Sequence, residues 1–252
     1  MREFGKKVRD KIDSEFSRRF PDRKRQDYVT SDDVLGRGGA DFCEPYLVGT
    51  PVTVEERVLG YCSRYFRMHY DSSYEVFSWL FQNPEHFTNT LFLDFGCGPG
   101  TSGVAFTDFM KGGDFQYVGV DRSPEMLKRG EEFLSFCGVI DRIFCDGGNL
   151  SSILYGRKAK IVIFNLCFSL GAGTFKGNID ELCALLNYSI EEISPKHAYI
   201  VYQNPEWQDS GHHVNWERLK SSAKGFSPLQ STPRQVDYGR RYPVHCDILY
   251  KG

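Results

Sequence analysis

The stretch LFLDFGCGPGT, residues 91–101, runs from a largely apolar segment into a turn that holds three glycines. A short apolar run of this kind is typical of a strand buried on both faces of a parallel sheet. Glycines are needed in the turn because a side chain would keep a ligand away from the backbone N–H groups that bind it. The stretch therefore predicts a strand, a loop and a helix in a doubly wound sheet that binds an adenosine-type cofactor.

Apolar runs alternate with helical segments after this stretch, which predicts an α/β domain with a mostly parallel sheet. The first strands are expected at 90–95, 116–120, 142–145, 160–166 and 197–202. Two further runs, 234–238 and 244–250, flank Gly239-Arg240-Arg241 and predict a hairpin that ends the sheet with an antiparallel strand. A helix over 214–224 would cover the sheet and place Trp216 in the core.

Acidic residues follow three successive strands of this predicted sheet. Asp94 stands two residues before the first glycine, Asp121 ends the segment YVGVD, and Asp146 ends the segment IFCD. Each acid alone can also be explained as a helix cap or a turn residue. Three acids at three neighbouring strand ends instead indicate one binding site, where carboxylates accept hydrogen bonds from a ligand.

With these residues the sequence resembles the class I S-adenosylmethionine (SAM)-dependent methyltransferases over about residues 90–252. The third glycine, Gly100, comes one residue earlier than in the dinucleotide fingerprint, which disfavours a nicotinamide oxidoreductase. The resemblance implies SAM as the cofactor and a seven-stranded sheet of order 3-2-1-4-5-7-6 with the seventh strand antiparallel. It also implies the cofactor-binding residues Asp94, Gly96, Cys97, Gly98, Pro99, Gly100, Asp121, Arg122, Met126, Asp146, Gly147, Asn165 and Leu166.

Among these, the resemblance assigns Asp94 and the glycine loop to the methionine part of the cofactor. Asp121 would bind the ribose, and Asp146 with Gly147 would bind the adenine. No metal site is predicted, because the eight cysteines form no C-x-x-C pair.

The methyl acceptor is expected at the carboxyl ends of the fourth and fifth strands. The fourth strand ends in Asn165-Leu166-Cys167-Phe168, which lacks the two prolines of enzymes that methylate base amines. The missing proline before Cys167 likewise disfavours a cysteine nucleophile, so a buried neutral thiol is expected. The candidate catalytic residues are Asn165, His212 and Tyr65. Alternatively, Asn165 only lines the pocket, His212 lies on the exposed surface, and Tyr65 packs in the core.

The N-terminal third is predicted to consist of two segments ahead of the methyltransferase domain at 89–252. Residues 1–52 form a basic helix and loop, in which Phe4, Val8, Ile12 and Phe16 mark a narrow apolar stripe. This helix either docks on the domain or serves as a basic arm for RNA, DNA or an anionic partner. Residues 53–88 are predicted to form helices at 54–68 and 73–82, started by capping boxes at Thr53 and Ser72. The resemblance implies that this segment is a lid that selects the acceptor.

Composition gives these alternatives different weight. The net charge of −2 gives nucleic-acid binding no global support, so a small-molecule acceptor is favoured. An RNA or protein methyltransferase and a catalytically weak methyltransferase-like scaffold remain as alternatives. Scattered cysteines, the lack of a secretory signal and the lack of a membrane-spanning run predict a cytoplasmic protein.

Overall fold

The computed structural model describes residues 1–36, 41–44, 51–170, 178–205, 212–229, 234–236 and 244–252. The predicted turn at 239–241 lies outside these ranges. The elements are α1 Glu3–Arg19, α2 Arg23–Val29, α3 Asp32–Leu35, α4 Val54–Phe81, η1 Pro84–Phe87, β1 Thr90–Phe95, α5 Thr101–Phe109, β2 Gln116–Val120, α6 Pro124–Phe136, β3 Arg142–Cys145, α7 Leu150–Leu154, β4 Ile161–Cys167, α8 Ile179–Ile193, β5 His197–Pro205, α9 His212–Ser222, β6 Ser227–Pro228, β7 Arg234–Val236 and β8 Val244–Lys251.

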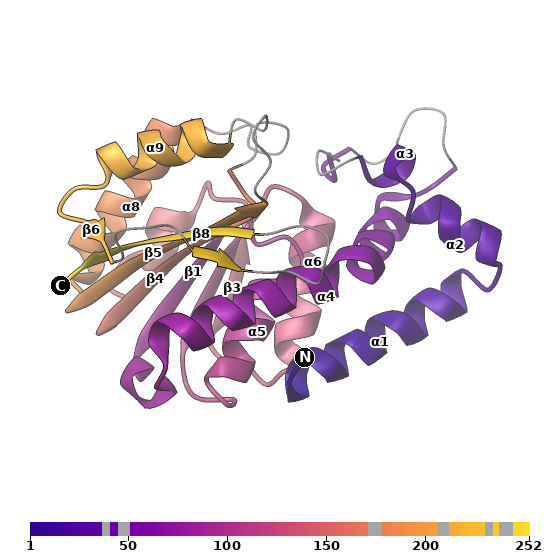
Figure 1. Ribbon diagram of the computed structural model, residues 1–252, viewed down its shortest axis with the longest axis horizontal. Coiled ribbons are helices and arrows are strands. Elements are labelled where there is room, and N and C mark those ends of the chain that lie inside the picture. The colour runs from indigo at the N-terminus through magenta and orange to yellow at the C-terminus, as the bar shows by residue number, and fades with distance from the viewer. Residues whose placement is uncertain (37–40, 45–50, 171–177, 206–211, 230–233, 237–243) are drawn as a thin grey trace.

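One mostly parallel sheet organises these elements, with strand order β3-β2-β1-β4-β5-β8-β6 (Figure 1). β8 runs antiparallel to β5, and the short strands β6 and β7 both pair antiparallel with β8. Since β6 and β7 pair with different parts of β8, they act as one interrupted strand. The predicted order 3-2-1-4-5-7-6 with an antiparallel seventh strand is confirmed, β8 being that seventh strand.

Alternate residues of the central strands enter two separate cores. Phe92 belongs to the core formed with α1, α4, α5 and α6, whereas Leu91 and Leu93 belong to the core formed with α7, α8 and α9. Helices α4 and α5 lie on one face of the sheet, and α8 and α9 lie on the other (Figure 1). Trp216 lies in the second core, stacks on Tyr202 at 4.5 Å and donates to Asp247 at 2.8 Å. The prediction that Trp216 is a core residue is confirmed.

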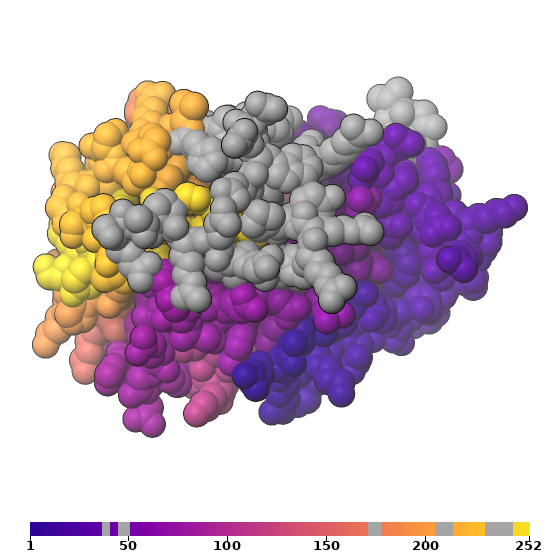
Figure 2. All heavy atoms as spheres, viewed as in Figure 1, coloured from indigo at the N-terminus to yellow at the C-terminus, as the bar shows by residue number. Residues whose placement is uncertain are grey.

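Helix α1 docks on the domain through its apolar stripe. Val8 and Ile12 are completely or almost completely buried in the first core. The buried Asp108 of α5 caps this helix, because its carboxylate accepts from the backbone N–H groups of Phe4 at 3.0 Å and Gly5 at 2.7 Å. In the space-filling view the indigo N-terminal segment is packed directly against the rest of the molecule (Figure 2). Of the two alternatives for this helix, the structure shows the one in which it docks on the domain.

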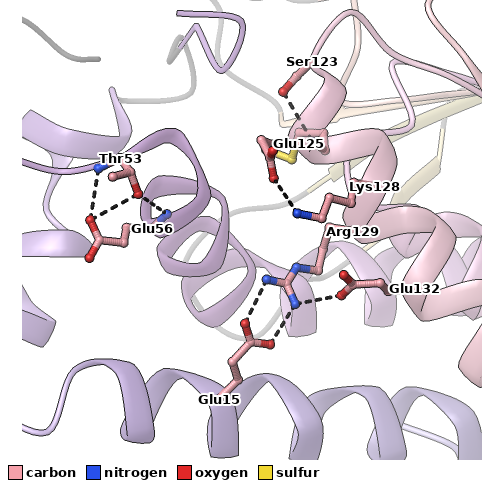
Figure 3. Close-up of polar contacts among 9 residues, drawn as sticks. Glu15, Thr53, Glu56, Ser123, Glu125, Lys128, Arg129 and Glu132 are labelled. Atoms are coloured by element: carbon pink, nitrogen blue, oxygen red, sulfur yellow. Dashed lines mark hydrogen bonds and ion pairs between the residues drawn. The ribbon is translucent and has the colours of Figure 1, made fainter. Parts of the chain in front are cut away.

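Helix α4 is a single helix of 28 residues where two were predicted. The capping box at Thr53 is confirmed, with Glu56 N–H donating to Thr53 Oγ1 and Glu56 accepting from Thr53 N–H (Figure 3). The prediction of a second capping box at Ser72 is wrong. Ser72 is buried and donates to Gln203 on β5 at 2.9 Å, so its hydroxyl binds the sheet and no chain break is needed.

Two short helices, α2 and α3, follow α1 within residues 1–52, which were predicted to hold one basic helix and a loop. Asp22 caps α2 by accepting from Lys24 N–H, and α3 buries Val34 and Leu35 against Val52. This tertiary burial stabilises segments whose local sequence is rich in turn-forming residues. Among the described helices, none combines the length and the apolar character required to span a membrane.

Candidate active site

The glycine loop leaves the carboxyl end of β1 and leads directly into α5. Gly98 has φ +51°, and its N–H donates to Asp121 Oδ2 at 2.9 Å. A Cβ at Gly98 would meet no atom of the described residues within 4 Å, whereas a Cβ at Gly96 would lie 2.6 Å from Cβ of Ser169. Gly96 is therefore required for packing inside the protein, while Gly98 faces open space that a ligand can enter.

Asp121 follows β2 and lies beside this loop, as the strand order requires. Its second oxygen, Oδ1, accepts from the N–H of Ser123 at 2.9 Å, so the carboxylate bridges the loop and the start of α6. Burial raises the pKa of Asp121, and the N–H donors of Ser123 and Gly98 oppose that rise. A partly buried carboxylate here can still accept hydrogen bonds from ligand hydroxyls, because each oxygen has further acceptor capacity.

Asp94, at the end of β1, is held in an internal network. Its carboxylate accepts from Tyr117 Oη and from Asn165 Nδ2, both at 2.8 Å, and the residue is 1% exposed. Burial raises the pKa of Asp94 to about 6, although both hydrogen bonds act in the other direction. The expected contact between Asp94 and the cofactor stays a prediction, and the observed role is to join β1, β2 and β4.

The remaining predicted cofactor residues surround the same sheet edge in different environments. Asp146 is exposed and accepts from Gly148 N–H at 2.9 Å, whereas Met126 is buried at the start of α6. Leu166 packs in the core on the α8 and α9 side, so its backbone is the part that a ligand could contact. The others lie in the loop or beside it: Cys97, Pro99, Gly100, Arg122 and Gly147.

The three candidate catalytic residues lie on three different elements, β4, α4 and α9. Asn165 is fully buried beside Asp94, and its Oδ1 has no hydrogen-bond partner among the described residues. Tyr65 lies on α4 within a group of aromatic rings. His212 is the first residue of α9, and its side chain lies outside the described residues.

His69 is a residue that the sequence analysis missed. Its ring stacks on Phe168 with centroids 4.2 Å apart and on Tyr65 at 6.0 Å, and its Nδ1 lies 3.4 Å from Tyr61 Oη. Burial lowers the pKa of His69 to about 4, so the imidazole is neutral at pH 7. A prediction of one helix over 54–81 would have placed three rings on one helix face, because Tyr61, Tyr65 and His69 are four residues apart.

Residues 41–44 lie against the start of α6, close to Asp121. Phe42 accepts at its carbonyl from Ser123 Oγ at 2.9 Å. The fully buried Arg57 of α4 donates to the carbonyls of Asp41 and Glu44 and lies over the Phe42 ring. Arg57 is thus a positioning residue for this segment, and no local sequence pattern indicated it.

Solved structures are similar to this chain, although its sequence matches no model of a known protein family and no curated protein. A protein of Nostoc punctiforme PCC 73102, assigned as an O-methyltransferase, aligns with 90% of this chain and 68% of its own, at 15% identity and a TM-score of 0.53. The strand order and this similarity agree. The chain has the class I methyltransferase fold.

Two further structures with a TM-score of 0.49 align with it. One is the magnesium protoporphyrin IX methyltransferase of Synechocystis PCC 6803 with bound SAH, at 15% identity over 90% of this chain and 98% of that one. The other, from Clostridium thermocellum, is assigned as an rRNA methylase and aligns at 16% identity over 72% of this chain and 96% of that one. Similarity at such low identity shows the fold alone.

Buried polar atoms without a partner gather where the class I methyltransferase fold has its strand ends. Among the described residues they include Thr101 Oγ1 at the start of α5, Ser169 Oγ after β4, and Gln203 Nε2 on β5. An unsatisfied buried polar atom costs about 1–3 kcal/mol, which a bound polar molecule would recover. With Asn165 Oδ1, these atoms and the open space at Gly98 fit a polar ligand along this edge.

Proposed function

We propose that this protein is a SAM-dependent methyltransferase that acts on a small molecule. The observation that carries the proposal is Gly98, which combines a positive φ, a hydrogen bond to the carboxylate at the end of β2, and open space where a side chain would lie. These three properties suit a nucleoside cofactor that approaches the backbone while its hydroxyls reach Asp121.

The residues of the site would each bind one part of the cofactor. The glycine loop would bind the methionine part, Asp121 the ribose, and Asp146 with Gly147 the adenine. Bound SAM supplies a methyl group that is already activated by its sulfonium. The protein then has to align the acceptor and exclude water, which the buried end of β4 and the α4 rings can do.

A small-molecule acceptor is supported by the state of the N-terminal segment. Helix α1 is docked by its apolar stripe, and two of the basic residues near the α1–α2 turn, Arg19 and Arg25, lie within ion-pair distance of Glu56. Such pairing reduces the positive field that RNA binding requires. A catalytically weak scaffold is disfavoured because the loop and the carboxylate at Asp121 are both in place.

Titration calorimetry tests the proposal. We expect SAM and SAH to bind the wild-type protein and NADH not to bind. Gly98→Ala should weaken SAM binding at least about tenfold, because a methyl group would enter the space of the ligand.

Gly138→Ala is the matched control. Gly138 also has a positive φ and open space at its Cβ position, but it follows α6, away from the loop. Both variants should lose similar folding stability, and only Gly98→Ala should lose affinity. Binding of NADH, or equal SAM affinity in the two variants, would contradict the proposal.

A further inference from the structure

Two rings of α4, Tyr65 and His69, and the ring of Phe168 after β4 form a nearly parallel stack. The Tyr65 and His69 planes meet at 13°, and the His69 and Phe168 planes at 19°. Tyr61 lies edge-on to His69 and tilted against Tyr65, and Phe42 packs against Tyr61. Tyr65, His69 and Phe168 all keep some exposed surface, so this stack is not sealed inside the core.

The stack lies next to the proposed cofactor loop. Phe168 follows the last residue of β4, and its N–H donates to the carbonyl of Gln203 at 2.8 Å. The next residue is Ser169, and its Cβ would lie only 2.6 Å from a Cβ at Gly96. Phe168 is therefore one residue away from a direct contact with the loop, at the strand end where the fold binds acceptors.

The backbone of Phe168 is strained, which indicates that its ring is needed where it is. Its φ is +57°, a left-handed value that glycine adopts freely and that costs a bulky residue about 1–3 kcal/mol. The conformation directs the ring onto His69, with centroids only 4.2 Å apart. Strain of this kind at a strand end is typical of residues that serve a binding site.

The stack offers no net charge to an acceptor. Burial lowers the pKa of His69 to about 4, and burial, with Cys167 and Asp121 nearby, raises the pKa of Tyr61. Arg64 lies over the outer ring, Tyr65, but pairs with Asp32 at 2.7 Å. A charged acceptor would lose its hydration here, and the described residues of the stack offer it no counter-ion.

We propose that Tyr65, His69 and Phe168 form the wall that binds the methyl acceptor, and that the acceptor is an uncharged molecule with a planar aromatic ring. Parallel rings extend naturally by one more ring, with the offset stacking that aromatic pairs prefer. The inference rests on the proposed function, since it names the substrate class of the same site.

Binding of a planar probe and of its saturated analogue to the full-length protein tests the inference. The probes are 2-naphthol and decahydro-2-naphthol, titrated into SAH-loaded protein and followed by ligand-observed NMR. We expect 2-naphthol to bind about threefold to tenfold more tightly than decahydro-2-naphthol, because aromatic stacking contributes a free energy in this range. Butyltrimethylammonium serves as a cationic probe and should bind more weakly than 2-naphthol.

Phe168→Leu keeps the apolar volume but removes the flat ring, and His69→Leu does the same at the centre of the stack. Each should weaken 2-naphthol binding about threefold to tenfold and leave the decahydro analogue unchanged. Tyr155→Leu, at a ring that is 77% exposed beyond α7, is the control and should change neither. A thermal unfolding curve and an SAH titration of each variant show whether it is folded.

Several outcomes would overturn the inference: equal affinity for the two naphthols, tighter binding of the cation, or unchanged 2-naphthol binding in both ring variants. If SAH binds while 2-naphthol does not, the aromatic wall is refuted and the proposed function stands. If SAH does not bind the wild-type protein, the proposed function fails, and the naphthol titration without SAH still tests the wall.

Discussion

Two neighbouring regions of this molecule bury titratable groups by different means. In the cofactor region, around the glycine loop, Asp94 and Asp121 are held by hydrogen bonds from donors on adjacent strands and turns. In the acceptor region His69 is held mainly by ring contacts, with Phe168 and Tyr65 on its faces. Burial favours the neutral form in both regions, which raises the pKa of the acid and lowers that of the imidazole.

The two regions should consequently respond to pH in opposite directions. An acid whose pKa is raised in the folded state destabilises the fold as it ionises. An imidazole whose pKa is lowered destabilises the fold as it becomes protonated. Between about pH 4 and pH 6 the two effects oppose each other in the wild-type protein, so variants are needed to separate them.

The largest expected effect belongs to Asp94. Its pKa rises from 3.8 to about 6, so its contribution to the free energy of unfolding should fall by about 2–3 kcal/mol as the pH rises from 4 to 7. Asp94→Asn cannot ionise and should lose this dependence. The measurement is urea unfolding of both proteins at pH 4 and pH 7, with the difference between them compared at each pH.

Subtracting the free energy of unfolding of the variant from that of the wild type at each pH cancels the titration of every other group. Comparing this difference between the two pH values also cancels any fixed cost of the altered hydrogen bonds. The difference should shift in favour of Asp94→Asn at the higher pH. A difference that is the same at both pH values would show that Asp94 titrates as an ordinary carboxylate, and the contrast between the regions would lose its first half.

His69 should give a smaller effect of opposite sign. Its pKa falls from 6.5 to about 4, so its contribution to stability is fully present above pH 6.5 and is lost as the pH falls toward 4. Because the ring keeps some solvent contact, we expect a loss of about 2 kcal/mol rather than the full value. His69→Gln should remove this loss, as measured by the same unfolding experiment at pH 4 and pH 7.

His197 is the control for this second test, since it is an exposed histidine at the opposite end of the sheet, bonded to Tyr250 Oη at 2.7 Å. His197→Gln should leave the low-pH loss in place. If His69→Gln keeps the loss as well, another group is responsible, and His69 does not differ from a surface histidine.

The same contrast explains how much the sequence could predict. The strands and the proximity of Gly98 to Asp121 follow from short contiguous motifs, because parallel strands bring their carboxyl ends to one edge. The strand order was implied by the resemblance to the class I methyltransferases. The acceptor region depends on contacts between residues far apart in the chain. His69 was missed because Ser72 resembled a helix cap, and its real partner, Gln203, lies on β5. Likewise, nothing local to Phe168 predicts its positive φ.

The smallest expected effect concerns the joint between the N-terminal segment and the cofactor region. Glu15 on α1 accepts from both terminal nitrogens of Arg129 on α6, at 2.7 and 3.0 Å, and Arg129 also donates to Glu132 (Figure 3). Glu15→Gln removes the charge but keeps an acceptor, and the Arg129 side chain, only 8% exposed, keeps Glu132. We expect the free energy of unfolding to fall by about 1 kcal/mol.

Glu3→Gln is the matched control, because Glu3 pairs with Lys7 on the same helix and both side chains are exposed. Thermal and urea unfolding should show no measurable change in this variant, while Glu15→Gln is destabilised and keeps its SAH affinity within about twofold. That result would mean that α1 stabilises the two regions together without tuning the cofactor site. A large loss of SAH affinity in Glu15→Gln would instead show that the ion pair positions α6 and, through Ser123, Asp121.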